Sequence, residues 1–196
     1  MTNSNKQPDI APGGSLVPTR TKIVNAAFQL FMDHGYDGTG LAQIVGTSGV
    51  SKGAFYHYFP SKSAIYAEVV ETFFLAPFKD FDLVELAKLS PKRAKTILQQ
   101  YYVALPEMVS KTTNQDLTRF YALMFDSISR LPDFQAKIAN IYADLIKALA
   151  KSFKPKGTTG KQARRAAKRK ARKFLAGLEG EIFLNAVLQQ PKKKAD

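Results

Sequence analysis

The stretch TGLAQIVGTSGVSKGAFYHYFPSK, residues 39–62, predicts two short helices joined by a tight turn. The first helix is indicated by Leu41 and Ile44 at helical spacing, and Thr39 ahead of them is the expected N-cap. The turn is indicated by Gly49, because glycine readily adopts the positive φ that a sharp turn requires.

The second helix is expected to begin after its N-cap Ser51 and to end before Pro60. Its inward face is expected to hold Ala54, Phe55, Tyr58 and Phe59. Its outward face is expected to hold Lys52, Gly53, Tyr56 and His57. A helix this short cannot bury its few apolar side chains by itself. It should therefore pack against a neighbouring helix and present its other side to a partner. Two helices joined by a short glycine-containing turn form the geometry that places the second helix in the major groove of DNA.

Residues 35–70, GYDGTGLAQIVGTSGVSKGAFYHYFPSKSAIYAEVV, resemble the DNA-binding domain of the TetR family of bacterial one-component repressors. The resemblance extends over roughly 19–74 and rests on Gly35, Thr39, the run GVSKG at 49–53, Tyr56, Phe59 and Lys62. The chain departs from the family at Val45 and Ser48, where alanine is usual, and at Gly40, where a Thr or Ser would offer a phosphate contact. The resemblance implies a three-helix DNA-binding domain followed by a helical domain that binds an effector.

Nine positions are the candidate DNA contacts: Thr39, Gln43, Ser51, Lys52, Gly53, Ala54, Tyr56, His57 and Lys62. Polar side chains and amides at helix starts anchor phosphates, Gly53 permits close backbone approach, and Ala54 can touch a thymine methyl. The competing interpretation is a surface helix hairpin with ordinary polar residues. With His34 and His57 as the only histidines, no metal site is expected.

Composition restricts the class of protein. The 196 residues are 45% hydrophobic and include no cysteine, which predicts a folded chain without disulfides or thiolate metal sites. No run approaches the ~20 apolar residues of a membrane span, and the N-terminal segment lacks the pattern of a signal peptide. A soluble, cytoplasmic protein that does not bind membranes is therefore expected.

The net charge of +13 is distributed unevenly. Residues 151–196 carry 14 Lys or Arg against 3 Asp or Glu, whereas residues 19–77 carry four of each sign. Net charge therefore does not itself support DNA binding through residues 39–62, and the motif has to carry that interpretation.

Apolar periodicity predicts an all-α chain, since no stretch shows β alternation. Helices are expected at 19–34, 62–76, 91–109, 114–130, 133–153 and 161–190. The expected organisation is a flexible arm at 1–18, a helix-turn-helix domain at 19–60 with its recognition helix at 51–58, a connecting helix at 61–77, an effector-binding and dimerisation domain at 78–190, and a disordered tail at 191–196.

Aromatic and Met residues on the middle helices are candidates to line a pocket for a small apolar or aromatic effector: Phe78, Tyr101, Leu105, Phe120, Tyr121, Met124, Phe125 and Tyr142. The competing interpretation is that they only form the core. Glu107 and Asp126 are the candidate buried acids, and so few acids give little support to a dedicated site for a cationic ligand.

The last two helices present more apolar residues than one neighbour can cover. A two-fold homodimer is expected to pair them, with the interface at Phe174, Leu178, Ile182, Phe183 and Ala186. A dimer would also read two half-sites of a palindromic double-stranded operator.

The run KQARRAAKRKARK, 161–173, is either the solvated start of a long helix or a surface for nucleic acid, an acidic partner or an anionic effector. The helix-turn-helix motif and the resemblance to the TetR family together predict a ligand-responsive transcriptional repressor that uses no cofactor. The alternative is a non-specific nucleic-acid-binding or architectural protein that acts through the basic run. An enzyme is not expected, because the sequence has no glycine-rich phosphate loop, catalytic triad or metal cluster.

Overall fold

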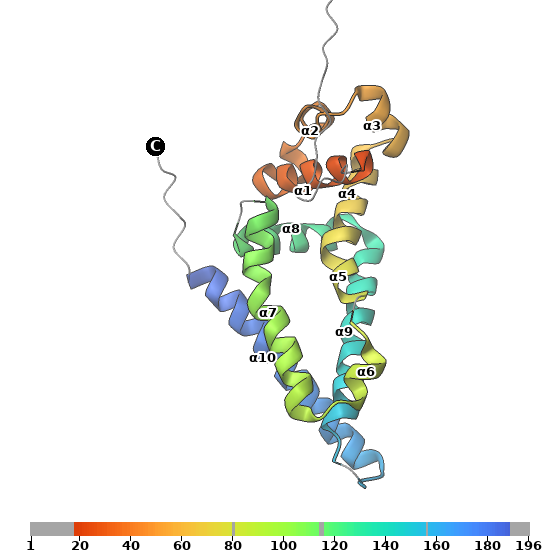
Figure 1. Cartoon of the computed structure of the whole chain (residues 1–196), viewed down its shortest axis with the longest axis vertical. Coiled ribbons are helices and arrows are strands. Elements are labelled where there is room, and N and C mark those ends of the chain that lie inside the picture. Colours follow the sequence, from red (N-terminus) through yellow and green to blue (C-terminus); the bar gives the residue numbers. More distant parts are fainter. Residues whose placement is uncertain (1–17, 80, 114–115, 156, 189–196) are drawn as a thin grey trace, which may run out of the picture. The chain divides into compact units, whose positions relative to one another are not determined.

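The computed structural model describes residues 18–79, 81–113, 116–155 and 157–188. Nearly all of the expected arm and all of the expected tail lie outside these ranges. The described residues form helices and no strands, which confirms the all-α prediction (Figure 1). None of these helices is long and apolar enough to cross a membrane. The chain divides into two compact units at residues 69 and 70, within the expected connecting helix.

Unit 1 contains α1 (Thr19–Gly38), α2 (Leu41–Ser48), α3 (Lys52–Tyr58) and most of α4 (Lys62–Val70). Gly35 interrupts α1 with a φ of 69°, which confirms the predicted helix end at this glycine. The side chains of α1 that face the core recur at helical spacing and are buried: Ile23, Ala27, Phe28 and Phe31.

A cluster of aromatic rings joins α1 to α4. The ring of Tyr66 lies edge-on to Phe31 and to Tyr36, with centroids 5.0 and 4.8 Å apart. At the periphery of this cluster, Arg20 forms a 2.6 Å ion pair with Glu68. These contacts hold α1 and α4 together as the base on which the two shorter helices rest.

Unit 2 contains the π-helical segment η1 (Glu71–Leu75) and six α-helices: α5 (Ala76–Lys79), α6 (Leu83–Lys88), α7 (Pro91–Thr113), α8 (Leu117–Arg130), α9 (Pro132–Phe153) and α10 (Lys161–Leu188). Carboxylates cap two of them, since Asp82 accepts from the backbone N–H groups that open α6 and Asp116 accepts from those that open α8. Pro132 begins α9, a position where its missing N–H costs no hydrogen bond.

Two prolines, Pro77 and Pro106, lie within helices that continue past them, although a proline is expected to end or kink a helix. Pro77 follows η1, where the amide of Ala76 donates to the carbonyl of Glu71, five residues back. The wider π-helical turn changes the spacing of the backbone hydrogen bonds from four residues to five at this point. The missing N–H of Pro77 therefore lies where the regular α-helical hydrogen bonding is already interrupted. Pro106 lies inside α7, which continues to Thr113.

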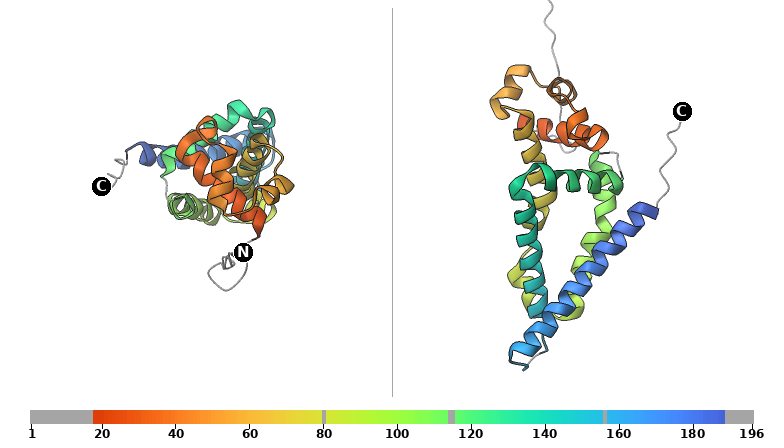
Figure 2. Two further views of the ribbon diagram at one scale, coloured as in Figure 1. Left: turned by 90° about the horizontal axis from the view of Figure 1, so that it is seen from above. Right: turned by 180° about the vertical axis from the view of Figure 1, so that it is seen from behind.

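The core of unit 2 forms where α10 packs along α9 and crosses α7. Figure 2 (right) shows α10 running diagonally across both helices. The buried side chains at these contacts are Leu98, Leu145, Leu149, Ala167, Ala171 and Leu175. Near the start of the unit, Phe74 of η1 lies between Phe120 of α8 and Phe134 of α9, with ring centroids 4.4 and 6.2 Å away. The segment that follows α4 is therefore anchored in the core of unit 2.

Candidate DNA-binding surface and effector site

Helix α3 is built by local signals and held by two aromatic anchors. Gly49 adopts a φ of 68° at the end of α2, and Ser51 Oγ accepts a 3.1 Å hydrogen bond from the amide of Ala54. The predicted turn and cap are both confirmed. Phe55 is completely buried and Phe59 nearly so, which fixes the inward face of this seven-residue helix.

The opposite face of α3 points to solvent. Lys52, Gly53, Tyr56 and His57 are exposed, as predicted. Tyr58 was expected inside but is 41% exposed, because Phe55 and Phe59 already fill the space against the rest of the unit. The Tyr58 ring lies edge-on to that of His57, with centroids 5.2 Å apart. The exposed surface of α3 is therefore more aromatic than expected.

Thr39 is not an N-cap, and the structure removes it from the candidate DNA contacts. Its side chain is only 1% exposed, and its hydroxyl lies 2.8 Å from the carbonyl oxygen of Gly35 and 3.1 Å from that of Leu30. Its amide donates to the carbonyl of Tyr36. Thr39 thus secures the start of α2 to α1.

The N-cap of α2 is Gly40, whose amide donates a 2.6 Å hydrogen bond to Gln43 Oε1. The side-chain oxygen of Gln43 is therefore committed to the backbone, while its NH₂ group remains able to donate to a phosphate or base. Lys62 is half-buried, and its Nζ lies 4.3 Å from the ring centroid of Tyr36. This cation–π contact holds the ammonium group against the Tyr36 ring.

The predicted effector residues fall into two separate ring clusters. In the first, Tyr101 lies edge-on to Phe81, while Phe78 lies 5.9 Å from Tyr101 and 6.0 Å from Tyr142. The second cluster consists of Phe120, Tyr121 and Phe125 on α8, with Phe183 of α10 against Tyr121. Leu105 and Met124 are half-buried.

Unit 2 contains a partly buried carboxylate, Glu179, which was not among the predicted residues. Tyr102 and Tyr142 both donate to Oε1 of Glu179, the latter over 2.6 Å. The candidates Glu107 and Asp126 instead form ion pairs with Lys111 and Arg130 on their own helices. The available signal was helical phase, because Glu179 lies four residues after Leu175 and borders the buried stripe of α10.

Tyr121 adds an unsatisfied group to this polar cluster. Its hydroxyl is buried and has no hydrogen-bond partner. Burial, and secondarily the negative charge of Glu179, raise the pKa of Tyr121 to about 12. The same two causes raise the pKa of Tyr102 and of Tyr142. All three phenols therefore stay protonated at neutral pH; Tyr102 and Tyr142 donate to Glu179, while the Tyr121 hydroxyl has no acceptor.

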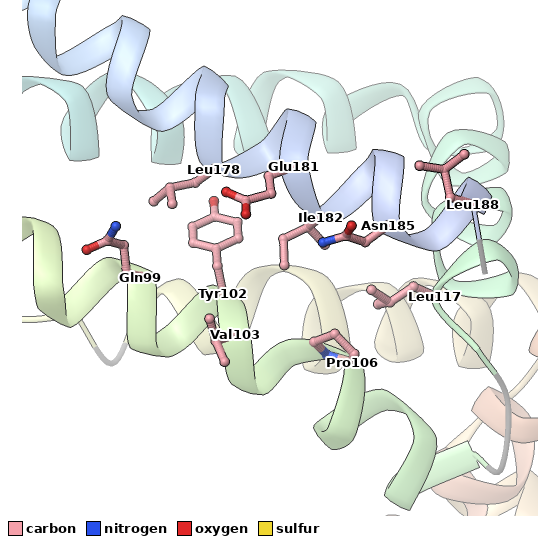
Figure 3. Close-up of a pocket in the computed structure, with 10 residues that line it drawn as sticks. All are labelled: Gln99, Tyr102, Val103, Pro106, Leu117, Leu178, Glu181, Ile182, Asn185 and Leu188. Atoms are coloured by element: carbon pink, nitrogen blue, oxygen red, sulfur yellow. The ribbon is translucent and has the colours of Figure 1, made fainter.

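A groove of about 440 Å³ lies between α7 and α10 (Figure 3). Its walls are mainly apolar, with amide and carboxylate groups at intervals: Gln99, Tyr102, Val103, Pro106, Leu117, Leu178, Glu181, Ile182, Asn185 and Leu188. None of the predicted effector residues is among them. Tyr102 belongs both to the groove and to the Glu179 cluster, so its side chain connects the two features.

The structure also corrects the predicted dimer face. Leu178, Ile182 and Ala186 are buried within the single chain, and the Phe174 ring lies 5.9 Å from that of Phe153. Only Phe183 of the predicted set is exposed. The free apolar face of α10 is a different stripe at helical spacing: Ala176, Gly180, Phe183, Leu184 and Val187.

The sequence of this chain matches those of known bacterial regulators. The family model described as "Bacterial regulatory proteins, tetR family" matches residues 23–69. The HTH-type transcriptional repressor DhaR of Mycobacterium sp. (strain GP1) is 33% identical over 91 residues, which are 46% of this chain and 44% of DhaR. The negative regulator of the icaADBC biofilm operon, IcaR of Staphylococcus aureus (strain Newman), is 28% identical over 135 residues, which are 68% of this chain and 67% of IcaR.

Solved structures share the fold. A transcriptional regulator from Aquifex aeolicus VF5 superposes with a TM-score of 0.62 at 22% identity, covering 89% of this chain and 91% of that one. A putative fatty acid metabolism regulator of Clostridium perfringens superposes with a TM-score of 0.60 at 19% identity, covering 83% and 84%. The family match identifies residues 23–69 as a DNA-binding domain of the TetR type, and the relatives and the fold support a TetR-family transcription regulator.

Proposed function

We propose that this protein is a transcriptional repressor that binds a double-stranded operator through α3. The observation that carries this proposal is the two-sided character of α3. Phe55 and Phe59 anchor one side, while Lys52, Tyr56 and His57 are free on the other. Their donors suit phosphate oxygens and base edges, and Gly53 lets the backbone approach the duplex. Unit 1 is the DNA-binding domain, unit 2 is the regulatory domain, and the protein acts in the cytoplasm.

The functional species is a homodimer joined through the free apolar stripe of α10. Phe183, Leu184 and Val187 are large apolar side chains left exposed by the single chain. Ala176 and Gly180 lie on the same face and permit close approach of a second helix. A two-fold pair supplies two α3 helices, which one operator needs in order to provide useful specificity.

The effector is a small, largely apolar molecule that carries a polar group for the Glu179 cluster. The groove between α7 and α10 offers apolar walls, and Tyr102 connects it to Glu179. Within the described residues no cation pairs with Glu179, and the buried Tyr121 hydroxyl has no partner. A ligand amine or hydroxyl would satisfy both groups, which favours an effector with a hydrogen-bond donor.

Coupling between effector and DNA runs through η1. A π-helical turn is a common feature of functional helices, and η1 directly follows α4 of unit 1. Phe74 of η1 is buried against Phe120, which lies three residues after the groove residue Leu117 on α8. An effector that displaces α8 therefore moves η1 and the end of α4. DNA and effector then weaken each other's binding by the same factor.

The function is tested by selecting bound sequences from a random pool of duplexes. The full-length protein is expected to enrich a palindromic sequence. The Lys52→Ala, Tyr56→Ala double variant, which keeps the inward anchors of α3, is expected to enrich none. Enrichment of one sequence by both proteins would show that α3 does not read the bases and would refute the proposal.

A further inference from the structure

The first thirteen residues of α10, 161–173, form a concentrated positive surface. They include eight Lys or Arg residues and no acid, and all eight cations are exposed. On a helix with 100° between residues, five of them lie on the side opposite the buried Ala167 and Ala171: Lys161, Arg165, Arg169, Arg172 and Lys173. Lys170 lies over the ring of Phe153, 5.9 Å from its centroid. We call the other seven exposed cations the basic face: Lys161, Arg164, Arg165, Lys168, Arg169, Arg172 and Lys173.

Intramolecular stability does not explain the basic face. Within the described ranges, none of its members forms an ion pair, and the two carboxylates of α10, Glu179 and Glu181, lie beyond it. Like charges repel one another at i and i+4, as between Arg164 and Lys168. Positive charge at a helix start is also opposed by the helix dipole. The surface therefore suits a polyanionic partner.

The density of charge favours duplex DNA among polyanions. Thirteen helical residues span about 20 Å, over which duplex DNA carries roughly one negative charge per 1.7 Å. Insertion into a membrane requires exposed apolar residues beside the cations. The non-basic residues that this segment exposes are only Gln162 and Ala166, and its alanine stripe is turned into the core.

The DNA-reading segment of the described chain has no comparable excess of positive charge. Residues 19–77, which include α3, carry four basic and four acidic side chains. One of those four cations, Arg20, is paired with Glu68. Neutralisation of phosphates is the main sequence-independent source of affinity for DNA. Among the described residues, the start of α10 carries the most concentrated positive charge.

We propose that the basic face of α10 is a second DNA-binding surface, which holds duplex phosphates without regard to sequence. It acts independently of base reading by α3. A repressor built in this way combines a neutral reading domain with a positively charged regulatory domain that raises its residence on DNA.

The test uses the full-length protein and a fluorescent 30-base-pair duplex that lacks the operator. Anisotropy titrations at 50 to 200 mM salt compare the wild type with the variant Arg164→Gln, Arg165→Gln, Lys168→Gln, Arg169→Gln. The matched control removes four exposed cations from other helices of unit 2 that, like the basic face, form no ion pair within the described residues: Lys92→Gln, Arg93→Gln, Arg119→Gln, Lys147→Gln. Thermal unfolding by circular dichroism checks that both variants are folded.

Each phosphate contact contributes about 0.9 to the slope of log affinity against log salt concentration. Four lost contacts should make the slope shallower by about 3 to 4, whereas the control should change it by less than about 1. Between 50 and 200 mM salt, the wild type should then lose roughly 100-fold more affinity than the α10 variant. Equal slopes for the α10 variant and the control would overturn the proposal.

Two competitors decide the class of partner. Polyglutamate and anionic phospholipid vesicles are added at the same total charge as an unlabelled competitor duplex. The unlabelled duplex is expected to displace the labelled DNA at a much lower concentration of charge than polyglutamate or the vesicles do. Equal displacement by polyglutamate or by vesicles would overturn the assignment to DNA. Because the duplex holds no operator, neither result bears on sequence reading by α3.

Discussion

Two neighbouring rings of α3 face opposite directions, so changing them is expected to have opposite consequences. Phe55 is completely buried, whereas Tyr56 is 44% exposed. Their rings meet edge-on, with centroids 5.5 Å apart. The variants Phe55→Ala and Tyr56→Phe therefore separate the packing of α3 from its contact with DNA.

The structure sets the size of each effect. Removal of a buried Phe side chain costs about 3–5 kcal/mol through lost burial and the cavity left behind. That is a large part of the total of about 5–15 kcal/mol for a typical protein, and a seven-residue helix is not stable without packing. Tyr56→Phe keeps the ring and its contact with Phe55, so its effect on unfolding should stay within about 0.5 kcal/mol. Loss of one hydroxyl contact per half-site should cost about 1 kcal/mol, or about 2 kcal/mol for a dimer, which is roughly 30-fold in operator affinity.

Urea unfolding followed by far-UV circular dichroism measures stability, and anisotropy with the selected operator measures affinity. The expected result is a strongly destabilised Phe55→Ala and a normally stable Tyr56→Phe that binds the operator weakly. If Tyr56→Phe binds as tightly as the wild type, Tyr56 does not touch DNA. If Phe55→Ala unfolds at the same urea concentration as the wild type, Phe55 is not the anchor of α3.

Further predictions concern the turn, the polar cluster and the dimer. Gly49→Ala should destabilise the protein by about 1–2 kcal/mol, because Gly49 has a φ of 68°, while Gly46→Ala, within α2, should not; urea unfolding of both variants distinguishes the cases. Tyr121→Phe should leave the unliganded protein as stable as the wild type or more stable, since the Tyr121 hydroxyl has no partner. Tyr142→Phe should lower the free energy of unfolding by about 1.5–3 kcal/mol, because it removes a donor to Glu179. A larger loss of stability in Tyr121→Phe than in Tyr142→Phe would contradict this. Above pH 10 stability should fall, because tyrosines of the unfolded chain ionise near 10 while folded Tyr121 keeps its proton to about 12. The raised pKa of Tyr102 and of Tyr142 should extend the fall to higher pH, and the fall between about pH 10 and 12 should be shallower in Tyr121→Phe. Leu184→Glu should yield monomers in sedimentation velocity, whereas Glu181→Gln on another face of α10 should stay dimeric.

The parts of the fold set by short-range signals were predictable from sequence. The positive φ at Gly49 and the Ser51 cap depend on residues within one turn of themselves, and both were predicted correctly. Phe55 and Phe59 follow from helical phase alone. For the same reason, helical phase places the exposed Lys52 and Tyr56 on the outer face.

The residues that were misplaced are those whose environment depends on distant parts of the chain. Thr39 has the local pattern of an N-cap, but α1 offers its hydroxyl two carbonyl oxygens, and burial against α1 takes precedence. Glu179 resembles a solvent-exposed acid until Tyr102 and Tyr142, from two other helices, are brought against it.

The dimer face was misplaced because α10 has apolar residues on two sides. Sequence periodicity detects both stripes but cannot tell which one α7 and α9 cover. The structure assigns Leu178 and Ile182 to the core and leaves Leu184 and Val187 exposed. Long C-terminal helices of this kind need the packing of their own chain before a surface can be assigned.

The central claim is that two copies of α3 read successive major grooves on one face of a duplex. Methylation interference at guanine N7 on the selected operator tests it most directly, because N7 lies in the major groove. We expect two patches of interference, symmetric about the centre of the palindrome, with centres about 10–10.5 base pairs apart. In Tyr56→Ala, the interference in both patches should weaken. A single patch, or interference confined to minor-groove positions, would contradict the account.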